Sequence, residues 1–442
     1  MSEIWTNWAR DQHCAPTIVE RPASEEELAR AIVRAVDHGQ PVRAVGAGHS
    51  FTDIACTDGV LLDLSAMGRP LHADPSTGRI TVQAGIRLHA LGPWLAERGL
   101  ALENQGDIDR QTLAGALATA THGTGLRFGN LSTQVIGMRL VTGSGEVVEL
   151  TRESDPEALL AARVSVGSLG IASTVTLQCV PLYTLRRVDR PQPLDAILDA
   201  LDAHVDGNDH FEFWVFPFTR TALTRTTTRI DTAPTPSPEW RRRLQEDLLE
   251  NRALELVCRT GRRLPRATPR LNRLIAWAMS ESTVEDRAYK VYASRRDVRF
   301  NEMEYAIPRA HGREAVERVL QLVERRRLPI LFPLEVRFTA GDDAFLSTAY
   351  GRDTCYIAVH QYTGMEFESY FRGVEAIMDE YDGRPHWGKR HYQSAATLSG
   401  RYPDWDRFQV VRARLDPSGS FTNDYALRTL GSVGAAVPVP GR

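Results

Sequence analysis

Cysteine is scarce in this chain, and its few thiols lie far apart. The 442 residues contain five cysteines, Cys14, Cys56, Cys179, Cys258 and Cys355, and no two of them form a C-x-x-C pair. This spacing excludes a disulfide scaffold and a thiol-rich metal site, and it is typical of a protein kept in a reducing cytosol.

Long apolar runs and a surplus of one charge are also absent. No stretch approaches the roughly 20 apolar residues of a membrane span, and no basic segment followed by an apolar one opens the chain. The 53 basic and 56 acidic residues leave a formal charge of −3, so no overall field favours nucleic acid. We therefore expect a cytoplasmic protein without nucleic-acid partners, for which peripheral contact with a membrane stays open.

The composition that remains is that of a soluble globular protein long enough for two domains. Ser24 and Glu27 form a capping-box pattern, which predicts a helix that ends at Gly39. Periodicity predicts further helices at 88–97, 313–325 and 367–378, and strands at 42–45, 60–64, 80–84, 136–141, 147–150, 172–180, 211–216, 298–307, 330–338 and 355–361. From about Pro181 aromatic strands alternate with helices, which indicates an antiparallel α+β unit. The Pro-rich stretch 233–238 indicates an exposed connector.

A histidine between glycines and hydroxyls marks the first candidate site. The segment Val45-Gly46-Ala47-Gly48-His49-Ser50 follows a predicted strand. Its glycines let the backbone turn tightly and present N–H groups to an anion, which suits a pyrophosphate. An ordinary turn is the alternative, whereas a Rossmann fingerprint fits poorly because Phe51 occupies the place of its third glycine.

Two more stretches of small residues follow. Residues 104–125 include Gly106, Asp107, Gly115, Ala116, Thr119, His122, Gly123 and Thr124, and residues 164–171 include Gly167, Gly170 and Ile171. Such segments let backbone lie against a flat ring, but a packed small-residue helix and a plain loop are the respective alternatives. His122 alone is more often a core histidine than a ligand. Three such loops on one domain could nevertheless cradle one extended dinucleotide.

Charged side chains gather in the C-terminal part of the chain. On a strand Glu335 and Arg337 point to one face, and the alternative to a functional pair is an ion pair on a solvent face. Segment 385–391 brings His386 and Lys389 together, and zinc is not expected because no cysteine or acidic residue lies at ligand spacing. His360 either faces the same cavity or packs in the core.

These motifs resemble one flavoprotein family. G-A-G-H-S-F-T-D, G-A-L-A-T-A-T-H-G-T-G, the E-x-R strand and H-W-G-K are similar to segments of the vanillyl-alcohol-oxidase (PCMH-type) family, in its aldonolactone oxidoreductase branch. That branch includes L-gulono-1,4-lactone dehydrogenases and D-arabinono-1,4-lactone oxidases. The resemblance covers nearly the whole chain. It implies an α+β fold with a two-subdomain FAD-binding domain at 1–180, an antiparallel cap or substrate domain at 181–380, and a segment, 381–442, that returns to the FAD domain.

The resemblance also implies a role for each motif. His49 carries the 8α-methyl group of a covalent FAD. The implied cofactor-binding residues are Val45, Gly46, Ala47, Gly48, His49, Ser50, Gly106, Asp107, Gly115, Ala116, Thr119, His122, Gly123, Thr124, Gly167, Gly170, Ile171, His386 and Lys389. The implied catalytic residues are Glu335, Arg337, Lys389 and His360, without a metal. Positive charge on Arg337 and Lys389 suits a developing alkoxide.

The predicted reaction is FAD-dependent oxidation of the C2 hydroxyl of an aldono-1,4-lactone, L-gulono-1,4-lactone or a near relative, to an ascorbate-type product. An alditol or polyol oxidase using oxygen is the nearest alternative, and a non-catalytic sugar-binding protein is the alternative from another class. Oxygen, a dye or cytochrome c could accept the electrons. The loop Ala114-Gly115-Ala116 is a candidate gate for oxygen, and the resemblance favours a dehydrogenase. The arginine-dense stretch 240–273 is either a solvated helix face or a docking face for acidic lipid or an electron-accepting protein.

Overall fold

Three β-sheets organise the computed structural model, which describes residues 4–235, 252–294 and 298–434. The parallel sheet contains, in order, β3 (Ile18–Glu20), β5 (Val60–Asp63) and β4 (Val42–Val45). The five-stranded antiparallel sheet contains β10 (Val147–Thr151), β9 (Val135–Val141), β11 (Ile171–Gln178), β7 (Arg79–Gln83) and β6 (Pro70–Asp74). The eight-stranded antiparallel sheet contains β16 (Ser282–Arg287), β13 (Thr184–Pro193), β15 (Thr221–Ile230), β14 (His210–Val215), β18 (Leu334–Thr339), β19 (Thr354–Tyr362), β17 (Phe300–Pro308) and β20 (Arg384–Pro385).

Helices cover these sheets, and two short strand pairs complete the described elements. The pairs are β1 (Trp5–Thr6) with β2 (His13–Cys14) and β8 (Leu100–Ala101) with β12 (Val180–Pro181). The helices are α1 (Glu25–Asp37), α2 (Leu88–Ala96), α3 (Leu113–Ala118), α4 (Pro156–Arg163), α5 (Leu194–Asp199), α6 (Leu201–Gly207), α8 (Ala253–Arg263), α9 (Thr268–Ala278), α10 (Ala288–Tyr292), α11 (Gly312–Arg326), α12 (Glu368–Asp379), α13 (Ala395–Leu398), α14 (Trp405–Leu415) and α15 (Asp424–Leu430). The predicted α+β class is confirmed.

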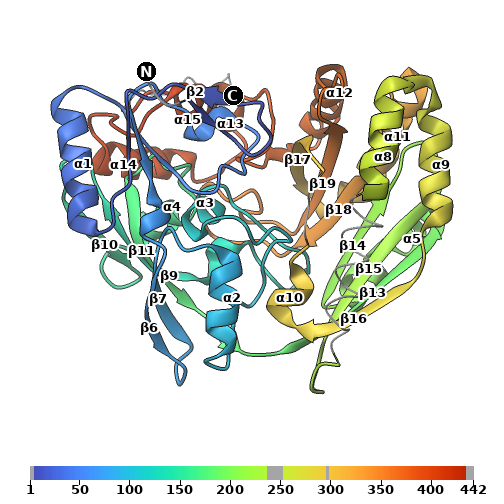
Figure 1. The fold of residues 1–442 in the computed structure, drawn as a ribbon, viewed down its shortest axis with the longest axis horizontal. Coiled ribbons are helices and arrows are strands. Elements are labelled where there is room, and N and C mark those ends of the chain that lie inside the picture. Colours follow the sequence, from blue (N-terminus) through green and yellow to red (C-terminus); the bar gives the residue numbers. More distant parts are fainter. Residues whose placement is uncertain (1–3, 236–251, 295–297, 435–442) are drawn as a thin grey trace.

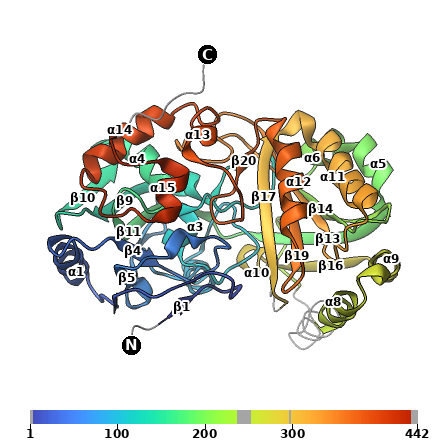
Figure 2. The same cartoon turned by 90° about the horizontal axis from the view of Figure 1, so that it is seen from above.

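The sheets form two lobes (Figure 1). The first lobe contains the parallel and five-stranded sheets with α1 to α4, and the second contains the eight-stranded sheet with α5, α6, α8, α9, α11 and α12. Seen from above, α13, α14 and α15 lie on the first lobe although they come last in the chain (Figure 2). Their apolar side chains, Trp405 and Phe408 among them, share one buried cluster with Leu159 of α4. The end of the chain therefore braces its beginning.

The eight-stranded sheet has one apolar and one polar face, because side chains alternate along each strand. Phe213, Val336, Ile357 and Met303 point to one side and are buried in the same cluster as Val319 of α11. Every residue of β18 and β19 is nevertheless buried, so the opposite face is covered as well. That covered polar face holds the second of two cavities described below.

Most predicted elements are present, with small errors at their ends. Ser24 caps α1 and accepts a hydrogen bond from the Glu27 N–H at 3.2 Å, as predicted, whereas the Glu27 carboxylate accepts from the Ala23 N–H at 2.8 Å and not from Ser24. The strand predicted at 330–338 was wrong at its start, because β18 begins at Leu334, directly after Pro333. Proline lacks the N–H that a central strand needs for its ladder. Of the Pro-rich connector, residues 236–238 lie outside the described residues, as do 240–251 of the arginine-dense stretch.

Candidate active site

The His49 loop leaves β4 and turns against the N-terminal residues. Gly48 adopts a φ of +65°, which glycine tolerates, and its carbonyl accepts a hydrogen bond from the Trp8 N–H at 2.7 Å. The Trp8 ring stacks on His49 with 5.5 Å between centroids. No hydrogen bond reaches the His49 imidazole from any residue that the structure describes. Burial, followed by the charge of Arg87, lowers the pKa of His49 to about 4, so the ring is neutral and its nitrogens can react.

Three loops that the sequence analysis singled out line one cavity. The predicted cofactor residues in its wall are Val45, Gly46, Ala47, Gly48, His49, Ser50, Gly115, Thr119, Gly167, Gly170 and Ile171. A Cβ on Gly46 would collide with the Thr112 hydroxyl, so only glycine fits there. The buried Thr52 hydroxyl in the same wall has no hydrogen-bond partner among the described residues, which leaves it available to a cofactor.

Three predicted cofactor residues line neither this cavity nor the second one. Ala116 is fully buried in the hydrophobic core of the first lobe. Gly123 and Thr124 continue past the cavity, and the Thr124 hydroxyl donates to the Phe211 carbonyl of β14 at 2.6 Å. Gly123 packs against Asn104 and Gln105, and Thr124 joins the second loop to the eight-stranded sheet. A cofactor contact of these three residues stays a prediction.

A second cavity opens over the polar face of the eight-stranded sheet. Strand registers place Glu212 opposite Arg337, Arg337 opposite Tyr356, and Glu302 opposite His360. The cavity wall contains Gly106, Asp107, Gln111, His122, Glu302, Glu304, Glu335, Arg337, His360, His386 and Lys389. Gln111 also lines the first cavity, so the two cavities meet there. The Phe51 N–H donates to the Gly388 carbonyl at 2.7 Å, which fixes the H-W-G-K segment against the His49 loop.

Arg337 is the centre of a buried ion network in this cavity. Its guanidinium lies 2.5 Å from Glu335, 2.7 Å from Glu212 and 3.4 Å from Asp107. Although burial disfavours the charge, these carboxylates raise the pKa of Arg337 well above its ordinary value. Glu335 and Arg337 therefore share a face as predicted, but the pair is buried and does not face solvent.

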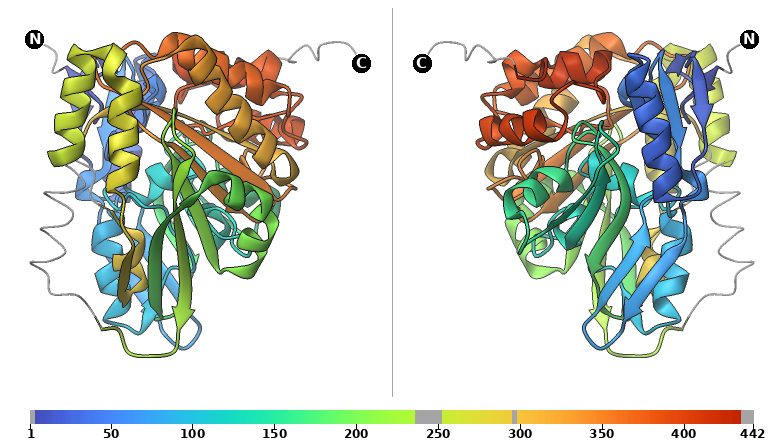
Figure 3. Two further views of the ribbon diagram at one scale, coloured as in Figure 1. Left: turned by 90° about the vertical axis from the view of Figure 1, so that its right-hand side faces the viewer. Right: turned by 90° about the vertical axis from the view of Figure 1, so that its left-hand side faces the viewer.

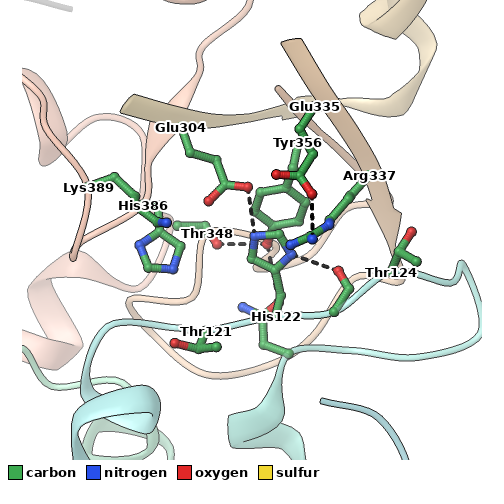
Figure 4. Close-up of polar contacts among 12 residues, drawn as sticks. Thr121, His122, Thr124, Glu304, Glu335, Arg337, Thr348, Tyr356, His386 and Lys389 are labelled. Atoms are coloured by element: carbon green, nitrogen blue, oxygen red, sulfur yellow. Dashed lines mark hydrogen bonds and ion pairs between the residues drawn. The ribbon is translucent and has the colours of Figure 1, made fainter. Parts of the chain in front are cut away.

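Lys389 and three histidines complete the network, shown in part in Figure 4. Lys389 forms an ion pair with Glu302, which also lies 3.4 Å from His360 Nε2. Burial raises the pKa of Glu302, but Lys389 and His360 together outweigh burial, and the pKa falls to about 2. On the other side, Glu304 lies 3.2 Å from His122 Nε2, while His122 Nδ1 donates to the Gly123 carbonyl at 2.8 Å. The His122 ring stacks on Tyr356 with 3.5 Å between centroids.

Acidic residues accompany these histidines in space, although none lies at ligand spacing along the chain. His122, Glu304 and His386 place possible ligand atoms within 4.8 Å of one another, and so do Glu302, Glu335 and His360. These acids come from other strands, so ligand spacing along the chain could not reveal them. His386 Nδ1, however, accepts a hydrogen bond from the Gly388 N–H at 3.1 Å, and Glu302 is paired with Lys389. Since these groups satisfy one another, we assign no metal.

Sequence reasoning missed Glu212, Glu302 and Glu304. All three alternate with apolar neighbours, as in Phe300-Asn301-Glu302-Met303-Glu304-Tyr305. An acidic residue recurring at every second place of an otherwise buried strand is unusual, because buried carboxylates need partners. This alternation of acidic and apolar residues could have identified the buried acidic residues of the site from the sequence.

The residues of the first cavity fit FAD, because glycine-rich backbone, a neutral histidine and an unpartnered hydroxyl line it together. Comparison with known proteins agrees. Residues 16–151 match the family model for an FAD binding domain, and residues 175–429 match the model described as D-arabinono-1,4-lactone oxidase. The chain is 62% identical to an L-gulono-1,4-lactone dehydrogenase of Mycobacterium tuberculosis, over 98% of this chain and 100% of that protein. It is 31% identical to an alditol oxidase of a Streptomyces species, over 96% of this chain and 98% of that protein.

Solved structures show the same fold at low sequence identity. A cholesterol oxidase from B. sterolicum superimposes with a TM-score of 0.81 over 96% of each chain, although only 17% of residues are identical. Both family models together cover most of the chain, and the second alone covers more than half. The protein is therefore an FAD-dependent oxidoreductase that belongs to the D-arabinono-1,4-lactone oxidase family.

Proposed function

We propose that this enzyme oxidises the C2 hydroxyl of an aldono-1,4-lactone, L-gulono-1,4-lactone or a near relative, to an ascorbate-type product. One observation carries the chemistry: Arg337 and Lys389 line a buried polar cavity that meets the His49 cavity at Gln111. Similarity to the M. tuberculosis lactone dehydrogenase supports the substrate.

The polar cavity suits the removal of a proton and a hydride from a secondary alcohol. FAD, when bound, supplies the hydride acceptor. Arg337 and Lys389 would stabilise negative charge as it develops on the substrate oxygen. Glu335 holds Arg337 in place and is positioned to orient hydroxyls. His360, fixed by its contact with the Pro333 carbonyl at 3.2 Å, would face the substrate from β19.

A substrate panel tests the lactone assignment against the two alternatives. Purified enzyme is mixed with L-gulono-1,4-lactone, D-arabinono-1,4-lactone, xylitol and sorbitol, and bleaching of flavin absorbance is followed without oxygen. We expect fast bleaching by lactones only. Faster bleaching by a polyol would favour an alditol oxidase, and a colourless protein that binds sugar without flavin would favour the non-catalytic alternative.

The covalent flavin link is a separate proposal, supported by the neutral His49 ring in the cavity wall. Acid precipitation of the purified enzyme should leave the yellow colour in the pellet, and His49→Ala should release it into the supernatant. A matched control is His89→Ala, an exposed histidine at the start of α2. Flavin found entirely in the supernatant of the parent enzyme would contradict the link.

We further propose that the enzyme is a dehydrogenase that reacts slowly with oxygen. Ala114 lines the first cavity, whereas Ala116 points into the core, so Ala114 is the alanine able to shield a bound ring. Stopped-flow mixing of reduced enzyme with air-saturated buffer should show reoxidation slower than turnover with cytochrome c or a dye. Ala114→Gly should speed that reoxidation, and Ala116→Gly should not. Parent enzyme that reoxidises as fast as it turns over is an oxidase.

Helices α8 and α9 support a peripheral contact with an anionic membrane. They lie side by side at the outer edge of the second lobe (Figure 3). Exposed Leu256, Leu264, Leu274 and Trp277 are interspersed with Arg259, Arg262, Arg263, Arg266, Arg270 and Arg273. Exposed apolar groups among cations suit a lipid surface.

Two further observations bear on location. No helix in the described part of the chain combines the length and apolar composition of a membrane span. All five cysteines are free thiols, which supports the proposed cytoplasmic location. Co-sedimentation with vesicles containing phosphatidylglycerol should be lost in Trp277→Ser with Arg270→Ser, and vesicles of phosphatidylcholine alone should not bind. If the double variant binds phosphatidylglycerol vesicles as well as the parent enzyme does, this face is not the membrane contact.

A further inference from the structure

Arg43 on β4 carries a buried charge with no carboxylate partner among the described residues. Its guanidinium donates five hydrogen bonds, and all end on backbone carbonyls: Ile54 at 2.6 and 3.0 Å, Phe421 at 2.8 Å, Val166 at 2.9 Å and Gly167 at 3.0 Å. Burial, followed by the charge of Arg412, lowers the pKa of Arg43 to about 10, so it stays charged at neutral pH. A buried cation without a counter-ion is unfavourable unless a partner supplies negative charge.

The same side chain holds together three segments that are distant in sequence. Val166 adopts a φ of +56° and Gly167 a φ of +66°. That conformation is strained for a β-branched residue, so surrounding bonds must hold it. Arg43 bonds both carbonyls of this turn, and the turn lines the first cavity. The position of the third loop therefore depends on Arg43.

Charge gives a second reason to connect Arg43 with the cavity. Of the described residues that line it, Arg43 alone carries a formal charge, because His49 is neutral. The other walls offer apolar groups, hydroxyls, amides and backbone. A dinucleotide, however, brings two phosphate charges into this low-dielectric site, where opposite charges attract far more strongly than in water.

We propose that Arg43 is a positioning residue for the pyrophosphate of the dinucleotide. Since its hydrogen bonds all go to backbone carbonyls, it acts through its fixed charge in the cavity wall and through the 166–167 turn that it holds. This assignment rests on the proposed place of FAD in the first cavity.

Comparing FAD with riboflavin, which lacks both phosphates and the adenosine, in two variants of Arg43 separates the effect of charge from that of packing. Arg43→Met and Arg43→Lys are made in a His49→Ala background, where flavin cannot be linked to His49, and flavin-free protein is titrated with FAD and with riboflavin. We expect Arg43→Met to lower the ratio of FAD to riboflavin affinity by about tenfold, the loss of one charge-assisted interaction. Arg43→Lys keeps the positive charge but loses the planar guanidinium with its several N–H donors. It should keep the ratio of FAD to riboflavin affinity within about threefold of the parent.

Arg412→Met is the matched control. Arg412 is also fully buried and donates to the Gly431 carbonyl at 2.9 Å, but it does not line the cavity. Its loss should lower the melting temperature and leave the affinity ratio unchanged.

Two results would overturn the proposal. One is a ratio of FAD to riboflavin affinity in Arg43→Met that stays within twofold of the parent, and the other is an equal fall of that ratio in Arg412→Met. If Arg43→Met does not fold, a tenfold drop in Arg43→Lys overturns it instead. Parent protein that binds neither flavin would contradict the place of FAD itself.

Discussion

At the scale of single residues, Arg337 lines the proposed substrate cavity and also neutralises three carboxylates, so two effects of its loss can be separated. Arg337→Met should lower kcat by on the order of 10²–10³ through the lost charge. It should also lower the melting temperature, since Glu335, Glu212 and Asp107 lose their common cation. Stopped-flow flavin reduction and thermal unfolding measure the two effects separately.

The control for Arg337 is an arginine whose ion pair is exposed. Arg372→Met breaks an i,i+4 pair with Glu368 on the surface of α12, and such pairs contribute little. Arg372→Met should therefore change neither kcat nor the melting temperature. Near-normal flavin reduction by Arg337→Met would remove Arg337 from the mechanism.

At the scale of elements, α11 ends on a residue in a conformation that suits glycine. Arg327 follows its last turn with a φ of 51° and is exposed. Arg327→Gly should raise the free energy of unfolding by about 0.5–1 kcal/mol, because glycine adopts this conformation without strain. Chemical denaturation measures the change. Arg326→Gly, one residue earlier and still helical, should lower the stability by a similar amount, and a gain in both variants would refute the explanation.

Elements also show what the sequence could and could not predict. Local patterns were sufficient for α1, β4 and the glycine loops, whose turn chemistry depends on neighbouring residues. The site required more: Glu302 meets Lys389 across 87 positions and Arg337 meets Glu212 across 125. Strand order decides such contacts, and local periodicity does not encode strand order. The division at residues 180 and 380 and the individual site roles stay predictions.

At the scale of the whole molecule, neutral buried histidines predict loss of stability in acid. Burial lowers the pKa values of His49 and His210 to about 4 and those of His386 and His391 to about 3, against an ordinary value of 6.5. Between pH 6.5 and 4 the unfolded chain therefore binds up to four more protons than the folded one at these histidines. Burial raises the pKa of Asp342 to about 6, which offsets one of them.

The balance of these groups, about three protons, lowers the stability by roughly 4 kcal/mol for each pH unit below 6. Melting temperatures recorded from pH 7 to 4.5 should fall by several degrees per unit. His210→Gln should make the slope shallower, because it removes one of the titrating groups. A melting temperature that does not change over this range would show that these rings are protonated in the folded enzyme.

The brace between the chain's end and its beginning has a consequence for synthesis. The Arg43 guanidinium binds the Phe421 carbonyl 378 positions later, and the Asn423 amide binds the carbonyls of Asp53, Ile54 and Cys56. On the ribosome, the first glycine loop emerges long before these residues exist. The lining of the first cavity ends at Ala172, but the bonds that brace its loops come from residues that are made last. We therefore expect a chain that ends before residue 421 to retain the cofactor less well than the full chain.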